Sequence, residues 1–446
     1  MNLAKALRAD RRMRLALVGA GGKTSTLFQL ARQFDGPVLV SASTHLSLDQ
    51  ITLGDHYIRV EEGSPLPADW FRPAGVTLLT GREIPEQERV AGLGTDALTD
   101  LWQAADRKEI PLLLEADGAR CMPLKAPASH EPAIPEWANT VVVVVGLSSL
   151  GQPLDGEHVH RAELFSKLSG LSLGEAVTPE AVTEVLRHPE GGLRNIPPGA
   201  RRYVLFNQAD TPDQAAVATR TAKDLVAEYD GVLIGAIGRR DPEDAILRIV
   251  TRGAGVILAG GSSERYGQPK QLLDFHGTPF IRKVAENALA AGCDPVLVVV
   301  GAVVDPIRIA LEGLPVQLVE NSEWRAGQST SLRAGVRALP ERVGNAVFFL
   351  SDQPQISPEL IHRLVDRHQR TLAPVVAPFV GEQRANPVLF DRAVLTDLLT
   401  VQGDRGGRAI LSSYPVERVD WPDKRILLDV DTPEDYRRLI EQTGPE

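Results

Sequence analysis

Residues 255–270 read GVILAGGSSERYGQPK, an apolar run that ends in a glycine-rich, basic turn. A continuous apolar run is typical of a strand that is buried on both faces of a parallel sheet. Glycines let the backbone turn tightly and bring its N–H groups against phosphates, while Arg265 and Lys270 can neutralise phosphate charge. Taken alone, the segment fits a nucleotide-binding loop and a plain strand-to-helix turn equally well.

Apolar runs of the same kind recur on both sides of this segment. Helical patterns separate several of them, for example over residues 24–34 and 211–229. This alternation predicts an α/β fold. The runs before the segment are LALVG (15–19), VLV (38–40), LLL (112–114), VVVVV (141–145), YVLF (203–206) and VLIGAI (232–237), and those after it are VLVVVG (296–301), VQLVE (316–320), AVFFL (346–350) and VVAPFV (375–380).

The chain is too long for one core. It has 446 residues, whereas single cores stop growing at about 250–300 residues. The polar segment 238–252 separates the two series of runs without a low-complexity linker. We therefore expect two domains, at residues 1–250 and 251–446.

Composition excludes several classes of protein. Hydrophobic residues make up 43% and charged residues 24%, as in ordinary globular proteins. The net charge of −10 argues against nucleic acid as a partner. The longest apolar run, residues 140–145, is far shorter than the roughly 20 residues that span a bilayer, so no membrane segment is expected. The only cysteines, Cys121 and Cys293, fall in different halves and indicate reduced thiols and a cytoplasmic location.

Acidic residues follow apolar runs in the second half. Asp352 lies in SDQP just after AVFFL, at the strand end where open α/β sheets bind ligands, and could hold Mg²⁺; a turn or capping aspartate is the alternative. Asp429 and Asp431 follow another apolar run, and Thr432 could cap the last helix. One of these two aspartates could be a second metal ligand, Asp431 being our choice, or simply part of a helix start.

Six segments in this half, taken in order, resemble the molybdenum cofactor nucleotidyltransferases, and the cytidylyltransferase branch most. The likeness runs from about residue 253 to the end and is more specific than any single motif. The segments are LAGGSSERYGQPK (258–270), NSEWRAGQSTSLRAG (321–335), LSDQP (350–354), RANPVLF (384–390), GDRGGRAIL (403–411) and DVDTPED (429–435).

The resemblance implies a GT-A-like, Rossmann-like nucleotidyltransferase domain. A molybdopterin phosphate would attack the α-phosphate of CTP and release pyrophosphate, with Mg²⁺ on Asp352. LAGG is also common in the guanylyl-transferring branch, so GTP stays open, as do another phosphorylated metabolite as acceptor and a non-catalytic cofactor carrier. The implied residues are Lys270, Arg265 and Asp352 for catalysis; Leu258, Ala259, Gly260, Gly261, Ser262, Ser263, Gly267 and Ser331 for the nucleotide; and Ser329, Arg333, Asn386 and Asp404 for the substrate.

The first half carries a phosphate-loop pattern of its own. LALVG ends in Gly19, and Ala20, Gly21, Gly22, Lys23 and Thr24 follow at the start of a helical pattern. This layout places N–H groups, a lysine and a hydroxyl around a phosphate and its Mg²⁺. It is not a full Walker A loop, because Leu17 stands where the first glycine belongs. ATP or GTP would be the ligand. Asp117, or Glu115 beside it, would face the metal; a turn aspartate before Gly118 is the alternative.

Weaker candidates follow other strands of this half. Ser43, Thr44 and His45 follow a strand, and NQAD at 207–210 is similar to a guanine-reading NKxD motif in which Gln208 replaces the lysine. Histidines 130, 158 and 160 have no cysteine at ligand spacing, which favours surface or substrate-contact roles over a metal site.

Over about residues 11–250 the chain resembles the YqeC-type accessory proteins of selenium-dependent molybdenum hydroxylases. This resemblance implies a setting, the maturation of a molybdenum hydroxylase, with the apo-enzyme or its chaperone as partner, and no particular reaction. The segments that carry it are VGAGGKTS (18–25), STHL (43–46), EADGAR (115–120), PLKAPASHEP (123–132), GLSSLGQPL (146–154) and HVHRAEL (158–164).

Overall fold

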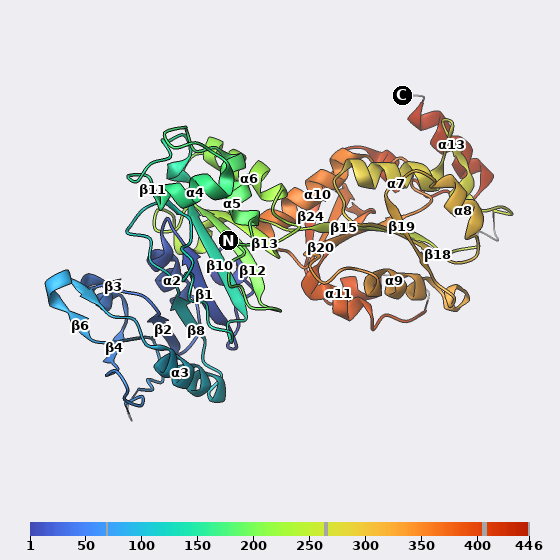
Figure 1. Cartoon of the computed structure of the whole chain (residues 1–446). Coiled ribbons are helices and arrows are strands. Elements are labelled where there is room, and N and C mark those ends of the chain that lie inside the picture. The colour runs from blue at the N-terminus through green and yellow to red at the C-terminus, as the bar shows by residue number, and fades with distance from the viewer. Residues whose placement is uncertain (68–69, 263–265, 404–407, 445–446) are drawn as a thin grey trace. The chain divides into compact units, whose positions relative to one another are not determined.

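The computed structural model describes residues 1–67, 70–262, 266–403 and 408–444. The chain divides into two compact units, Met1–Val250 and Thr251–Glu446, each with its own sheet and core (Figure 1). Within the described ranges, no helix is both long and apolar enough to cross a bilayer.

The described part of the N-terminal unit is built on a nine-stranded sheet. All neighbours pair in parallel except the edge strand β14, which is antiparallel to β13. The central strands β1, β8 and β10 are buried along their whole length, as their unbroken apolar sequences predict. In spatial order the strands are β14 (Ile246–Val250), β13 (Gly231–Gly235), β12 (Arg201–Asn207), β10 (Thr140–Gly146), β1 (Arg14–Gly19), β8 (Leu112–Glu115), β2 (Val38–Ala42), β5 (Val76–Thr80) and β4 (His56–Arg59).

Helices and short strands surround this sheet. Helix α2 packs against β1, β2 and β8, and α6 packs against β13. The helices are α1 (Leu3–Ala6), α2 (Lys23–Ala31), α3 (Thr95–Arg107), α4 (Ala162–Ser169), α5 (Pro179–Arg187) and α6 (Pro212–Lys223); the short strands are β3 (Leu46–Ser47), β6 (Glu83–Ile84), β7 (Arg89–Val90), β9 (Leu124–Lys125) and β11 (Val159–His160).

The C-terminal unit has a mixed sheet. Strands β19, β18, β15 and β20 are parallel to one another, β23 runs antiparallel to β20 and β21, and β24 pairs in parallel with β21. In spatial order the strands are β19 (Val316–Glu320), β18 (Val296–Val300), β15 (Gly253–Ala259), β20 (Asn345–Leu350), β23 (Val388–Asp391), β21 (Val375–Val380) and β22 (Gln383–Arg384), with β24 (Val416–Asp420) beside β21 and a separate hairpin of β16 (Asp274–Phe275) and β17 (Thr278–Pro279).

Helices cover both faces of this mixed sheet (Figure 1). Helices α7 and α10 close one core, and α9 and α11 close the core on the opposite face. The helices are α7 (Phe280–Ala290), α8 (Asp305–Ala310), α9 (Gln328–Arg337), α10 (Pro358–Thr371), α11 (Arg392–Leu398), α12 (Arg408–Leu411) and α13 (Pro433–Thr443).

The predicted α/β class is confirmed, and each predicted apolar run lies in or overlaps a strand. The polar segment 238–252 contains one further strand, the edge strand β14, in which Leu247 and Arg248 are half-exposed. One expectation about a segment was wrong, because the helix expected over 211–229 ends at Lys223. Thr432 caps α13, as predicted, by accepting a hydrogen bond from the Asp435 N–H.

Candidate functional site

Two parallel strands bring the glycine-rich turn and Asp352 to one edge of the C-terminal sheet. In the register of β15 and β20, Leu258 lies opposite Leu350. The turn that starts at Gly260 and the carboxylate of Asp352 therefore follow neighbouring strands at their carboxyl ends. This edge is where open α/β sheets bind ligands.

Lys270 links this edge of the sheet to the segment that contains Asp431. Its Nζ lies 2.6 Å from Asp431 Oδ1 and 3.9 Å from Asp352 Oδ2. The Lys270 side chain is only 13% exposed, so the ion pairs are partly shielded from water. Residues distant in sequence thus form one cluster in which a lysine lies between two carboxylates.

Asp352 has an unusual acidity. Burial raises the pKa of its carboxyl to about 6; Lys270 acts in the opposite direction, and the nearby carboxylates of Asp429 and Asp431 raise the pKa further. Asp429 is held in place because it accepts a hydrogen bond of 2.7 Å from Gln353 Nε2. The site therefore carries more negative charge than Lys270 alone balances, which favours a bound cation.

We expect Asp352→Asn to stabilise the metal-free C-terminal unit at pH 7.5 by about 1–2 kcal/mol, less than the full pKa shift because the side chain is 27% exposed. The folded-state pKa, about 6, lies above the ordinary value of 3.8, so the cost of ionised Asp352 to stability is complete above pH 6 and declines as the pH falls from 6 towards 3.8. Urea unfolding at pH 7.5 and pH 5 measures the difference; an equal effect at both pH values would contradict the assignment.

The donor set fits Mg²⁺ held together with a substrate. Among the residues with described positions, no group of three or more His, Cys, Asp or Glu side chains could hold a metal alone. Mg²⁺ commonly binds through one or two carboxylates, with waters and substrate phosphates completing its shell. Asp352, with Asp431 as the second candidate, could supply the protein ligands.

The glycine-rich turn is held by hydrogen bonds to its backbone. The buried Gln271 donates from Nε2 to the carbonyl oxygens of Gly261 at 2.8 Å and Ala259 at 3.3 Å. A Cβ on Gly260 would lie 2.4 Å from Ser331 Oγ, so the backbone approaches α9 more closely than another residue would allow. Of the other predicted nucleotide contacts, Leu258 and Ala259 end β15, Ser262 lies in the turn, Gly267 has a φ of +82°, and Ser263 and Arg265 lie outside the described residues.

Asn321 is a functional candidate that the sequence analysis missed. It follows β19, is buried, and donates from Nδ2 to Thr330 Oγ1 at 2.8 Å and to Ser331 Oγ at 3.0 Å. It thereby fixes the first turn of α9 beside the glycine-rich turn. An asparagine directly after an apolar strand, at the same sheet edge as Asp352, was the signal available in the sequence.

The four residues predicted to contact the substrate differ in their surroundings. Ser329 is 1% exposed, and its Oγ has no hydrogen-bond partner, so it can donate to a ligand. Arg333 donates from Nη1 to the carbonyl oxygen of Val401 at 2.6 Å. Asn386 precedes β23, whose Val388 pairs with Phe348 of β20, which places it at the edge of Asp352. Asp404 lies outside the described residues.

The N-terminal phosphate-loop pattern forms a tight turn between β1 and α2. Gly19, Gly21 and Gly22 have φ values of +93°, +89° and +115°. A Cβ on Gly21 would lie 2.4 Å from the backbone N of Gly146, so only glycine fits there. Lys23 begins α2, is 5% exposed, and donates from Nζ to the carbonyl oxygen of Gly19 at 2.9 Å.

The two acidic candidates behind this loop have different partners. Glu115 Oε2 accepts from Thr24 Oγ1 at 2.9 Å, and burial raises the pKa of Glu115 against the opposing effect of Lys23. Asp117 Oδ2 accepts from the Gly19 N–H at 3.0 Å and from Lys125 Nζ at 2.8 Å. Lys23 Nζ lies between them, 3.6 Å from Glu115 and 3.2 Å from Asp117. Glu115, and not the predicted Asp117, therefore contacts the Thr24 hydroxyl, which is the group of the loop that would bind a metal.

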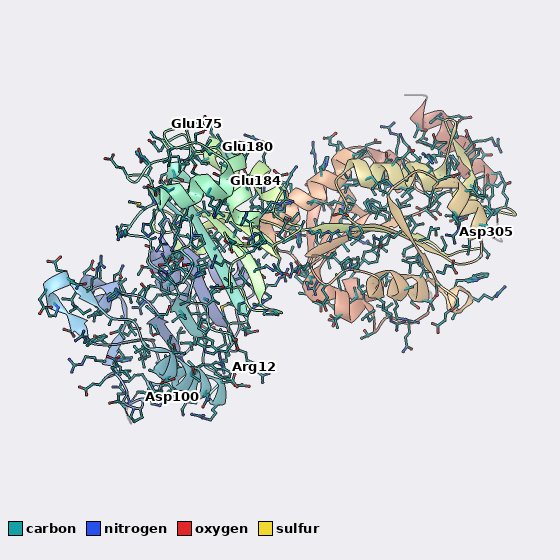
Figure 2. All side chains as sticks on the ribbon, viewed as in Figure 1. Arg12, Asp100, Glu175, Glu180, Glu184 and Asp305 are labelled. Carbon is teal, nitrogen blue, oxygen red and sulfur yellow. The ribbon has the colours of Figure 1, made fainter. Side chains whose placement is uncertain are left out.

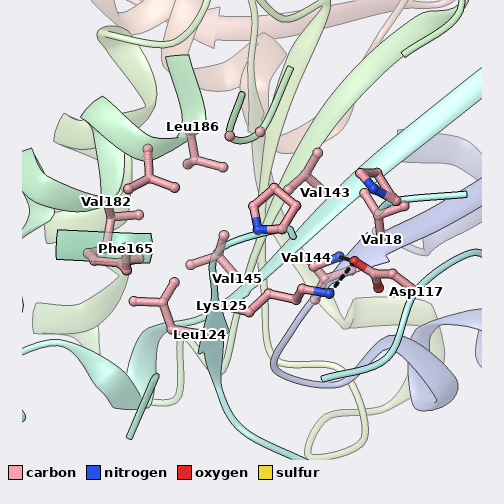
Figure 3. A pocket seen from close by; sticks show the side chains of 16 residues that line it. Val18, Asp117, Leu124, Lys125, Val143, Val144, Val145, Phe165, Val182 and Leu186 are labelled. Carbon is pink, nitrogen blue, oxygen red and sulfur yellow. Dashed lines mark hydrogen bonds and ion pairs between the residues drawn. The ribbon is translucent and has the colours of Figure 1, made fainter. Parts of the chain in front are cut away.

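A second buried ion network lies beside Asp117. Lys125 Nζ also lies 2.8 Å from Glu131 Oε2, and Arg161 holds the same carboxylate with bonds of 2.7 and 3.0 Å. Burial opposes ionisation of Glu131, but the bonds from Arg161 and Lys125 lower its pKa to about 2. Figure 3 shows Lys125 reaching Asp117 at the side of an apolar cavity of about 40 Å³. All three residues lie in segments that resemble the YqeC-type proteins, yet none of them was a predicted site residue.

The other polar candidates that follow strands of this unit, and its histidines, have varied surroundings. Ser43, Thr44 and His45 line a groove of about 1060 Å³ together with residues 59–65 and 91–97. His130 is 76% exposed, and His158 Nδ1 lies 2.8 Å from Asp155 Oδ1; burial lowers the pKa of His160. Cys121 is exposed and Cys293 buried, both as free thiols.

Comparison with known families assigns each unit separately. Residues 255–419 match the MobA-like NTP transferase domain, and residues 15–163 match the YqeC protein family. The first match contains the glycine-rich turn, Lys270 and Asp352; the second contains the phosphate loop, Glu115, Asp117 and the Lys125 network.

Three relatives match most of their own length. YqeC of Escherichia coli K12, an uncharacterized protein, is 32% identical over 47% of this chain and 82% of its own. Nicotine blue oxidoreductase of Paenarthrobacter nicotinovorans is 31% identical over 42% of this chain and 95% of its own. A probable molybdenum cofactor guanylyltransferase of Mycobacterium avium is 30% identical over 42% of this chain and 95% of its own.

Proposed function

The chain belongs to the MobA-like NTP transferase family over residues 255–419 and to the YqeC family over residues 15–163, and on this basis we propose that its C-terminal unit transfers CMP from CTP to molybdopterin with release of pyrophosphate. That unit is a nucleotidyltransferase of MobA type; the base, the acceptor and the dependence on Mg²⁺ are the proposal. The observation that carries it is the cluster of Lys270, Asp352 and Asp431 at the edge of the glycine-rich turn.

Positioning and charge stabilisation account for this chemistry. The phosphate of molybdopterin is already ionised and would attack the α-phosphate of CTP in line, so the protein need not activate a nucleophile. Triphosphate oxygens would displace the carboxylates from Lys270 Nζ, which then neutralises charge that develops on the phosphates. Asp352 would hold Mg²⁺, which supplies further charge stabilisation when bound. Ser329 and Asn386 would contact the acceptor.

The relatives and the sequence motifs favour different nucleotides. A probable guanylyltransferase is 30% identical to this unit, whereas the six segments together resemble the cytidylyl branch most. GMP transfer from GTP is therefore the second candidate.

The test is pyrophosphate release by the full chain with Mg²⁺, molybdopterin and either CTP or GTP. We expect turnover with CTP to exceed that with GTP by at least about 10-fold, a difference that one base-specific set of hydrogen bonds can supply. Preference for GTP would replace cytidylyl by guanylyl transfer. If neither nucleotide yields pyrophosphate, the molybdopterin assignment fails, and the likeness to nicotine blue oxidoreductase makes dye reduction the next activity to assay.

For the N-terminal unit we propose nucleotide binding in the service of molybdenum hydroxylase maturation. Gly19, Gly21 and Gly22 would surround the phosphates with backbone N–H groups, and Lys23 and Thr24 would contact the terminal phosphate and its Mg²⁺. The ligand is ATP or GTP. The apo-hydroxylase or its chaperone would be the protein partner, and the cytoplasm the compartment.

A further inference from the structure

Asn207 ties the phosphate loop to two other loops of the N-terminal unit. Its side chain is 2% exposed. Its Nδ2 donates to the carbonyl oxygen of Gly21 at 2.8 Å, and its Oδ1 accepts from the N–H of Ile237 at 2.8 Å. A Cβ on Gly22 would lie 2.5 Å from Asn207 Nδ2, so the amide lies directly against the turn. One buried side chain thus fixes the loops after β1, β12 and β13 relative to one another.

The strand order gives these loops a common direction. β12 is one strand removed from β1 across β10, β13 follows on the far side of β12, and all four are parallel. Their carboxyl ends therefore lie along one edge. A nucleotide with its phosphates at residues 19–24 could extend its base along this edge to residues 207–210 and 236–239. The hydrogen bond of 2.9 Å from the Ala209 N–H to the Gly235 carbonyl closes the two base-side loops on each other.

Asp210, in the loop at residues 207–210, is a side chain that could select the base. Its carboxylate is 24% exposed and pairs with Arg239, which is 66% exposed and lies on the loop after β13. An ionised carboxylate only accepts hydrogen bonds. Guanine presents two adjacent donors, its N1–H and its 2-amino group, whereas the corresponding edge of adenine has an unprotonated N1 and no 2-amino group. A carboxylate that faced the base at this position would therefore select guanine over adenine.

Gln208 occupies the lysine position of the similar guanine-reading motif. It has a φ of +66°, and its Oε1 accepts from the Ser148 N–H at 3.2 Å. A Cβ on Gly146 would lie 2.6 Å from the same oxygen. The glutamine therefore holds the loop after β12 against the loop after β10. Of the other residues of the motif, Asn207 contacts the phosphate loop and Asp210 is the one that could face the base.

We propose that the N-terminal unit binds guanine nucleotides and that Asp210 reads the base. This inference rests on the proposed nucleotide binding at Lys23 and narrows it from ATP or GTP to GTP. The bound base would take the place of Arg239 on the carboxylate, an exchange favoured by the exposure of that arginine.

The experiment exchanges the hydrogen-bonding character of residue 210. Binding of GTP, xanthosine triphosphate (XTP) and ATP to the full chain is measured by calorimetry at a temperature where Lys23→Met is still folded. The binding that Lys23→Met removes is assigned to the N-terminal unit, and the binding that remains is assigned to the transferase unit. In Asp210→Asn the amide can donate to the C2 carbonyl of xanthine. We expect GTP binding to weaken by about 10- to 100-fold and XTP binding to strengthen by a similar factor.

Asp213→Asn is the matched control, because Asp213 is an exposed aspartate in the first turn of α6; it should leave both affinities within about 2-fold. A gain of XTP binding cannot come from a misfolded variant, so it supports the assignment directly. Equal affinity of the Lys23-dependent component for GTP and ATP, or equal effects of Asp210→Asn and Asp213→Asn, would overturn the guanine inference alone. Absence of any Lys23-dependent component would overturn nucleotide binding by this unit as well.

Discussion

Asp352→Asn is expected to lower nucleotidyl transfer by the full chain by about 10²–10³-fold, because the carboxylate proposed to hold Mg²⁺ is replaced by a neutral amide of the same shape. The substitution also removes the charge that Lys270 and Mg²⁺ would share. Pyrophosphate release under saturating CTP and molybdopterin measures the loss. Because the same change is expected to stabilise the metal-free unit, reduced activity cannot be attributed to unfolding.

Asp305→Asn serves as the control for that measurement. Asp305 lies exposed in the first turn of α8 (Figure 2), outside the Lys270 cluster, and its replacement should change turnover by less than about 2-fold. If Asp352→Asn retained more than about a tenth of the activity, Asp352 would not be the principal metal ligand. Asp431 would then be tested by the same substitution.

The interior strands of both sheets could be predicted because their sequences are apolar without interruption. VVVVV becomes β10 and VLVVVG becomes β18, each buried along its length. Edge strands give a weaker signal. β4 has a single buried residue, Ile58, and β24 has none, and their sequences HYIR and VERVD resemble surface loops as much as strands.

The sequence indicated which residues are candidates for the site, but it did not indicate which side chains they contact. Asp352 and Lys270 were predicted because one follows a strand and the other ends a glycine-rich turn. The roles of Glu115 and Asp117 could not be distinguished from sequence, because both follow the same strand two residues apart and only packing decides which one receives the Thr24 hydroxyl. Asn321 likewise depends on contacts with α9, about ten residues further along the chain.

The ion network of Lys125, Glu131 and Arg161 shows why the contacts of a residue cannot be predicted from its sequence position alone. Lys125, Glu131 and Arg161 lie in segments separated by up to 36 positions, and each is an ordinary charged residue in sequence. Folding places all three together and leaves Asp117 bound to Lys125 and to the Gly19 N–H. Asp117 is thus tied to the turn itself, so that it positions the phosphate loop.

Lys23→Met is expected to destabilise the N-terminal unit by about 3–5 kcal/mol, because it leaves the buried carboxylate of Glu115 without its cation. Glu115 loses its ion pair with Lys23, while Asp117 keeps Lys125. Without Lys23 the pKa of Glu115, already raised by burial, rises further, so the cost is greatest at high pH and shrinks as the pH falls and the carboxyl protonates. Thermal unfolding at pH 8 and pH 5.5 should show the larger loss at pH 8.

The matched control is Lys167→Met, which removes an exposed lysine on α4 and should shift the unfolding midpoint by no more than about 1 °C. At a temperature where Lys23→Met is still folded, nucleotide binding by the N-terminal unit should be lost while pyrophosphate release changes by less than about 2-fold. This outcome follows if the two units perform separate steps. Loss of pyrophosphate release in the folded variant would instead mean that the phosphate loop and the transferase site act in a single reaction, and the independent roles proposed for them would be wrong.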